Sequence, residues 1–182
     1  RSNTLGTQRT ITVDPAKITA SNVDFRDIKF QNPIDLSGIS GGSGDAGGNS
    51  GITFTTAQPQ WFKHTSGAVN WSDSSKWFSD QAKTIPGRVP LPQDDATFDA
   101  GSFSGTSTLT VNVPRIGRSL DMSAVDDTVT MTLANAIESY GSFVLGNNIT
   151  PVGNYRIGLN GRGNFDFNSY NRPLYILGMT TP

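Results

Sequence analysis

Apolar and polar residues alternate in short runs along much of the chain, and this pattern restricts the fold more than any other feature. Three such runs lie in the N-terminal third, at residues 10–13, 22–30 and 51–55. Alternation with a period of two predicts half-buried strands, because neighbouring side chains of a strand point to opposite faces. The sequence therefore predicts a protein built from short β-strands.

The parity of the apolar residues changes within the second run. Val23 and Phe25 share one face of a strand, whereas Ile28 and Phe30 have the opposite parity. One regular strand cannot bury both pairs on the same side, so the run predicts a bulge or a corner between two sheets near Arg26–Asp27.

The chain after residue 95 predicts eight more strands, separated by little except Gly, Asn, Asp and Pro. Such spacing leaves room only for tight turns and none for helical crossovers. Similar apolar residues recur there at ladder-like intervals, which favours short rungs wound around one axis. We therefore predict a single all-β domain over residues 1–182, a β-solenoid of the parallel β-helix type, with a β-sandwich or jelly roll as the alternative. The expected strands are 96–98, 108–113, 119–122, 128–133, 142–145, 155–159, 164–167 and 174–177, and the rung residues are Leu109, Val111, Ile116, Leu120, Val129, Met131, Leu133, Ile137, Phe143, Leu145 and Ile149.

Composition excludes several classes of function. The 14 basic and 15 acidic residues leave a net charge of −1, which offers no field to attract nucleic acid. No apolar run is long enough to cross a bilayer as a helix, so membrane insertion is not expected. The chain has no cysteine, which excludes disulfides and thiolate metal sites, and we predict no cofactor.

Residues 37–51 are rich in glycine and predict a loop rather than a strand. A phosphate-binding loop is not expected, because no Gly-Lys-Ser/Thr ending and no helix pattern follow. Asp45 and Asn49 could supply oxygen ligands to Ca²⁺, but the repeated Gly-Gly-x-Gly-x-Asp unit of calcium-binding solenoids is missing. A plain loop with no metal is the preferred interpretation.

Residues 58–95 hold all three tryptophans, Trp61, Trp71 and Trp77, and predict a compact aromatic insertion. Exposed rings would form a platform on which sugars stack, whereas buried rings would form a small satellite core. The satellite core is preferred, because tryptophans bury readily. His64, the single histidine, is expected to be a surface polar residue rather than a general base.

Two carboxylate pairs, Asp94/Asp95 and Asp24/Asp27, are the only arrangement that suggests a glycan hydrolase or lyase. Adjacent residues of a strand point to opposite faces, so Asp94 and Asp95 pair poorly. The other two are expected to be solvated or corner-forming. We therefore predict no catalytic residues and no enzymatic activity.

The run Thr10, Ile11, Thr12 and Val13 is the candidate assembly element, since a strand near a chain end can be added to the sheet of a neighbour. Two sequons begin at Asn70 and Asn148, and each would accept an N-glycan in a glycosylating secretory route.

Several short blocks carry a resemblance to a known class of protein, and their order covers most of the chain. They include Asn70-Trp71-Ser72 followed by Trp77, and the turn 44–52, in which Ala46 stands where the pattern often has cysteine. The remaining blocks are residues 1–7, 23–28 and 88–95. The chain in this respect resembles the β-solenoid segments of phage tail-associated and other surface proteins, and of autotransporter-like passenger repeats.

The resemblance implies a protein of the virion, of the cell surface or of an extracellular appendage, and transfers no active site. Its expected role is that of a structural subunit of a filament, fibre or tail, with identical subunits as partners. A glycan-binding module that uses the tryptophans is the alternative, and a tailspike-like hydrolase or lyase is the third.

Overall fold

A computed structural model describes residues 3–4, 6–153, 156–160 and 165–166. Its contacts divide the chain into two compact units. The first takes in the chain up to Ala57 together with Leu91–Gln93, and the second takes in Gln58–Pro90 and the chain from Asp94 onward. A chain that the sequence analysis treats as one domain thus contains two cores.

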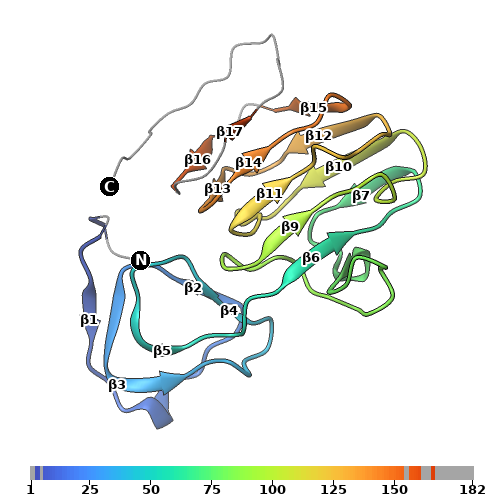
Figure 1. The fold of residues 1–182 in the computed structure, drawn as a ribbon. Helices are drawn as coiled ribbons and strands as arrows, with labels where there is room; N and C mark the ends of the chain where they lie inside the picture. Colours follow the sequence, from blue (N-terminus) through green and yellow to red (C-terminus); the bar gives the residue numbers. More distant parts are fainter. Residues whose placement is uncertain (1–2, 5, 154–155, 161–164, 167–182) are drawn as a thin grey trace. The chain divides into compact units, whose positions relative to one another are not determined.

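The first unit consists of short parallel strands that alternate between two sheets. Strands β1, β3 and β5 form one sheet, and β2 and β4 form another (Figure 1). Phe30 and its buried neighbours Ile28, Ile34 and Leu36 make the core. The elements are β1 (Arg9–Ile11), the 3₁₀ turn η1 (Pro15–Lys17), β2 (Val23–Phe25), β3 (Ile28–Asp35), β4 (Ser43–Asp45) and β5 (Ser50–Thr53).

The corner predicted at Arg26–Asp27 is confirmed. It separates β2 from β3, which belong to different sheets, and Asp27 has the left-handed φ of 54° that a sharp turn needs. The change of parity in the sequence therefore records a change of sheet.

The prediction of a loop over residues 37–51 is wrong in part, because the segment contains β4 and the start of β5. Glycine is required here by close backbone approach: a Cβ on Gly51 would lie 2.4 Å from the carbonyl oxygen of Phe30. The Asn49 amide donates to the Phe25 carbonyl and to Asp45, and its oxygen accepts from the Ile28 amide. Asn49 thus braces the corner.

The second unit repeats three strand positions in the same order along the chain. Within the described residues it contains a six-stranded sheet (β17-β14-β11-β9-β6-β8), a four-stranded sheet (β15-β12-β10-β7) and the pair β13-β16 (Figure 1). The elements are β6 (Pro59–Phe62), β7 (Gly67–Asn70), the 3₁₀ turn η2 (Ser74–Lys76), β8 (Trp77–Phe78), β9 (Asp95–Thr97), β10 (Ser107–Val111), β11 (Ser119–Asp121), β12 (Val129–Leu133), β13 (Ile137–Ser139), β14 (Phe143–Val144), β15 (Ile149–Val152), β16 (Ile157–Leu159) and β17 (Phe165–Asp166).

Each strand pairs in parallel with the strand one turn later, which makes the unit a β-solenoid. Val129 pairs with Ile149, 20 residues on, and Leu120 pairs with Phe143, 23 residues on. Antiparallel pairing joins only β6 and β8 among the described strands. The predicted all-β solenoid is confirmed, and the sandwich and jelly-roll alternative is excluded because those folds are antiparallel.

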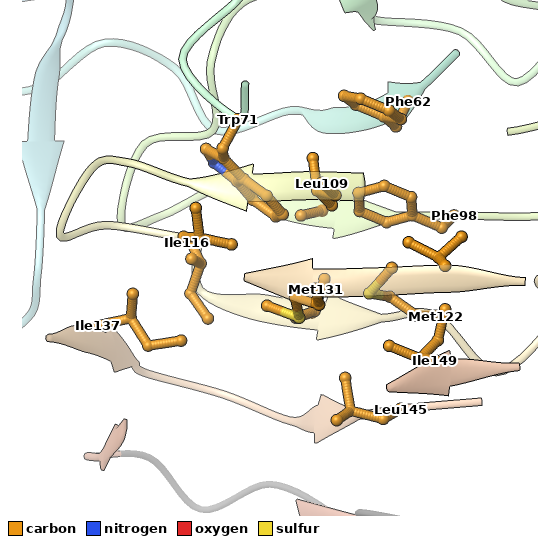
Figure 2. Packing of buried hydrophobic residues seen from close by; sticks show 14 of the residues in the cluster. Phe62, Trp71, Phe98, Leu109, Ile116, Met122, Met131, Ile137, Leu145 and Ile149 are labelled. Atoms are coloured by element: carbon orange, nitrogen blue, oxygen red, sulfur yellow. The ribbon is translucent and has the colours of Figure 1, made fainter. Parts of the chain in front are cut away.

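Buried apolar side chains form a stack inside this coil (Figure 2). Leu109 lies over Met131, and both side chains are fully buried. All eleven rung residues expected from the sequence are buried. The strands β13 and β15 are additional to the prediction, and the expected strand 174–177 lies outside the described residues.

The aromatic segment 58–95 is not an insertion beside the core. It supplies β6, β7 and β8, and its rings belong to the main cluster of the second unit. Phe62, Trp71, Trp77, Phe98 and Phe103 pack there with ring centroids 4.7–6.0 Å apart. The satellite core predicted from the sequence is therefore part of the principal core.

Candidate assembly edges

The strand predicted for assembly lies at the edge of the first sheet. β1 covers Arg9–Ile11, and Thr12 and Val13 follow it. It pairs in parallel with β3, with Ile11 opposite Phe30. In this register the Arg9 amide donates to the Asp27 carbonyl, so the amide of Thr10 points to the other side. No described strand pairs with that side of β1.

The open edge of β4 is closed by a side chain instead of a strand. The Gln93 oxygen accepts from the Asp45 amide at 2.8 Å, and its nitrogen donates to the carbonyls of Ser43 at 2.9 Å and Thr55 at 2.8 Å. The Thr55 hydroxyl accepts from the Ser43 amide. One carboxamide therefore replaces a peptide group of the next rung.

The last described strand of the four-stranded sheet carries proline at its edge. The Val129 amide donates to the Asn148 carbonyl, and Val129 pairs with Ile149. This register turns the nitrogens of Thr150 and Val152 toward β12 and the nitrogen of Pro151 away from it. Because proline has no N–H, the outer edge of β15 lacks a donor at its centre.

The chain itself closes the outer side of β8. The Gly87 amide donates to the Trp77 carbonyl, and the Ser79 amide donates to the Ile85 carbonyl. The antiparallel pair β6–β8 and the returning segment 85–87 thus end the six-stranded sheet with paired backbone groups.

The tryptophans for which a glycan-stacking platform was the alternative interpretation are mostly buried. Trp71 is fully buried and Trp77 is 1% exposed, so neither ring can meet a sugar. The Trp77 indole donates to the Trp71 carbonyl at 2.8 Å. Trp61, on β6, is half-buried. The preferred interpretation of buried rings is confirmed for Trp71 and Trp77, and the alternative of a sugar-stacking platform is wrong for both because their rings fill the core. Tyr170 and Tyr175, whose rings could extend such a platform, lie outside the described residues.

The carboxylates proposed as a hydrolytic pair have separate structural partners. Asp94 is fully buried and accepts from the Arg88 guanidinium at 2.7 and 2.9 Å and from the Gln58 amide. Asp95 points to the outer face and pairs with Arg118. The opposite orientation of these neighbours was predicted from strand geometry and is confirmed.

The other pair is divided between solvent and a corner. Asp24 is exposed on β2, and Asp27 is buried where the chain turns into β3. Asp27 accepts from the Gly6 amide at 3.1 Å. Asp24 and Asp27 therefore do not resemble a pair of carboxylates that share a substrate.

A further ion pair joins two loops of the second unit. Lys83 donates to Asp99, which also accepts from the amide of Gly101. Burial raises the pKa of Asp99, but the hydrogen bond and charge of Lys83, together with hydrogen bonds from Gly101 and Ser102, outweigh burial and hold the pKa below the ordinary value of 3.8. Asp99 is therefore ionised at neutral pH, and its bonds to Lys83 and Gly101 hold the two loops together.

The two sequon asparagines have different surroundings. Asn70 is exposed at the end of β7, next to the buried Trp71. The Asn148 amide donates to the carbonyls of Val125 and Asp126, so a glycan there would remove at least one of these bonds. Asn70 is therefore the better placed acceptor, and modification of either residue stays a prediction.

His64 is half-buried and not the exposed polar residue that the sequence predicted. Both ring nitrogens are buried without a hydrogen-bond partner among the described residues, and the ring lies edge-on to Phe103. No group of three or more His, Cys, Asp or Glu side chains in the described part of the chain could hold a metal ion. In that same part, no helix has the length and apolarity to cross a membrane.

Comparison with known proteins adds no relative. Neither the family models nor the curated proteins nor the solved structures gave a match. Inference about function therefore depends on the geometry of the strand edges and faces.

Proposed function

We propose that the protein is a non-enzymatic structural subunit of an extracellular filament, fibre or phage tail-type appendage, and that identical copies join through the edge of β1. The observation that carries the proposal is the outer side of β1, where the amide of Thr10 faces away from β3. Unpaired backbone groups of an edge strand favour the addition of another strand.

The contrast with three other edges supports this choice. Gln93 occupies the edge of β4, Pro151 removes a donor from β15, and the segment 85–87 covers β8. β5 and β7 also end their sheets and are not among these three edges. A contact between β1 and such an edge of the next copy is heterologous, and it propagates into a filament when its rotation does not close.

Deletion of β1 is a poor test of this proposal. Ile11 and Val13 pack against the core that contains Ile28 and Phe30, and the Asn32 amide donates to the Val13 carbonyl. Removing residues 1–14 would therefore expose core side chains as well as remove the edge.

A substitution of Thr10 separates the two effects. Thr10→Pro removes only the outward-facing N–H, which an edge strand tolerates because β1–β3 pairing uses the amides of Arg9 and Ile11. We expect filaments or large oligomers of the unaltered protein in electron micrographs and in light scattering, loss of assembly in Thr10→Pro, and assembly retained in the control Thr10→Ala.

A protein that stays monomeric at high concentration would overturn the proposal. Assembly that persists in folded Thr10→Pro would overturn the role of the β1 edge. Circular dichroism and the urea midpoint of each variant show whether the fold is intact.

A further inference from the structure

The outer side of β16 is a strand edge at one end of the coil (Figure 1). β16 pairs in parallel with β13, with Ile157 opposite Ile137, and the Ile137 amide donates to the Arg156 carbonyl. Because successive residues of a parallel strand bond to alternate sides, the backbone groups of Ile157 and Leu159 point away from β13. No described strand pairs with that side of β16.

The residue directly after β16 carries a buried donor that has no acceptor in the described part of the chain. This donor is the side-chain nitrogen Nδ2 of Asn160. Leaving a buried donor unpaired costs about 1–3 kcal/mol, so such groups are rare. Asparagine at the end of a turn can bond to another rung, as Asn148 does when it donates to the Val125 carbonyl 23 residues earlier. Asn160 therefore indicates a further backbone segment beside β16.

The described chain has already begun the turn that would supply such a segment. β17 follows β16 and pairs in parallel with β14, with Phe165 opposite Phe143, 22 residues earlier. In the preceding turn β14 is followed by β15 and then by β16. A chain that repeats this course after β17 returns to the outer side of β16.

A short repeat in the sequence identifies the residues that return there. Residues 155–160 read Tyr-Arg-Ile-Gly-Leu-Asn, and residues 175–180 read Tyr-Ile-Leu-Gly-Met-Thr. Tyrosine and glycine recur at the same positions, and apolar residues flank the glycine in both copies. The offset is 20 residues, as it is between Ile137 and Ile157. One more turn of equal length therefore brings Leu177 opposite Ile157.

We propose that residues 177–179 of the same molecule bind the outer side of β16 as the next rung of the coil. Leu177 then lies opposite Ile157 and Met179 opposite Leu159, so that both apolar side chains extend a stack of buried residues. The strand begins at Leu177, the last residue of the strand expected at 174–177.

The segment of the same molecule fits this edge better than the segment of another copy. The connection from Leu159 to Leu177 is as long as the one from Ser139 to Ile157, which makes one turn. Binding within one molecule also avoids the loss of translational freedom that association costs. The edge of β16 is then closed to identical copies. This contact does not rest on the assembly through β1.

Introduced cysteine pairs test the register, because the chain has no cysteine of its own. Register partners on neighbouring strands are about 4.8 Å apart, a separation that a disulfide spans. We expect Arg156→Cys/Ile176→Cys to form a disulfide within monomers under mild oxidation. The control pair Arg156→Cys/Thr180→Cys is displaced by about 13 Å along the strand, so its disulfide should form at least about tenfold more slowly.

Non-reducing electrophoresis and mass spectrometry of the linked peptides distinguish the outcomes. No disulfide in the first pair, or equal rates in the two pairs, would overturn the proposed register. A disulfide that joins two molecules would overturn binding within one molecule. Far-UV circular dichroism establishes that each variant is folded.

Hydrogen exchange tests the same contact without cysteines. The amides of Ile157 and Leu159 should be protected in the unaltered protein, and Leu177→Asp should accelerate their exchange about tenfold or more. Ile176→Asp places the same charge on the other face of the strand and should leave this exchange unchanged. Fast exchange in the unaltered protein, or equal exchange in the two folded variants, would contradict the proposal.

The contact at β16 and the assembly through β1 can fail separately. Thr10→Pro alters only the edge of β1, so the amides of Ile157 and Leu159 should keep their protection in this variant. Loss of that protection in folded, monomeric Thr10→Pro would show that another copy, and not residues 177–179 of the same chain, covers β16.

Discussion

At the scale of single residues, the cost of losing an ion pair depends on burial. Arg88 and the fully buried Asp94 form a two-pronged pair, whereas Arg118 and Asp95 form one with side chains 56% and 40% exposed. Arg88→Met should lower the free energy of unfolding by about 3–5 kcal/mol, because it leaves a buried carboxylate without its cation. Arg118→Met should cost at most about 1 kcal/mol. Urea unfolding checks both, and equal losses would contradict the expected difference.

The pKa of Asp99 leads to a pH dependence with a definite sign. A pKa below the ordinary 3.8 in the folded state means that the acid contributes stability above that value. The contribution is lost as the pH falls through 3.8 toward the folded pKa. We expect Asp99→Asn to reduce the acid sensitivity of the unfolding midpoint between about pH 5 and 3.

Lys83→Met tests the cause of this shift. Without the hydrogen bond and charge of Lys83, the pKa of Asp99 should rise, since burial then acts with less opposition. A carboxyl titration by NMR measures the change directly. An unchanged pKa of Asp99 in this variant would show that Lys83 is not its cause.

At the scale of elements, side chains and not only strands decide where a sheet stops. Gln93→Leu removes three hydrogen bonds from the edge of β4. Leaving such groups unpaired costs about 1–3 kcal/mol each. Exchange of the Asp45 amide with solvent deuterium should therefore become about tenfold faster or more.

Gln93→Glu is the matched control for this edge. The carboxylate can still accept from the Asp45 amide but cannot donate to the carbonyls of Ser43 and Thr55. Asp45 should keep more protection in Gln93→Glu than in Gln93→Leu. Equal exchange rates in the two variants would mean that the Asp45 bond does not limit opening of this edge.

At the scale of the whole molecule, two cores predict two separable unfolding transitions. All three tryptophans belong to the second unit, so their fluorescence reports on that unit, while far-UV circular dichroism reports on both. Met131→Ala should shift the fluorescence transition by about 2–5 kcal/mol, since it removes a fully buried side chain. Ile34→Ala, in the core of the first unit, should shift only the dichroism transition. Equal shifts in fluorescence would indicate one cooperative structure.

The sequence predicted burial correctly where the face of the strand that carries a side chain decides whether it is buried. Leu109, Met131 and Ile137 were expected inside because of their spacing, and all three are fully buried. The predictions failed where residues distant in the sequence decide what surrounds a side chain. Nothing near His64 in the sequence shows that both of its ring nitrogens would be buried beside Phe103. The burial of Trp71 and Trp77 was predicted, but their place in the principal core instead of a satellite core was not.

The sequence by itself determined the strands, the corner at Arg26–Asp27 and the stacked interior of the coil, because these follow from local alternation and from the small turns between runs. Only the tertiary structure decided which strands became neighbours. Parallel pairing joins residues about 20 positions apart, and the seal that Gln93 makes over Ser43 spans 50 residues. The recurring apolar residues indicate stacked rungs but not which strands pair or in which register, and a single side chain such as Gln93 has no repeat in the sequence, so the sealed edges emerge only when the coil is closed.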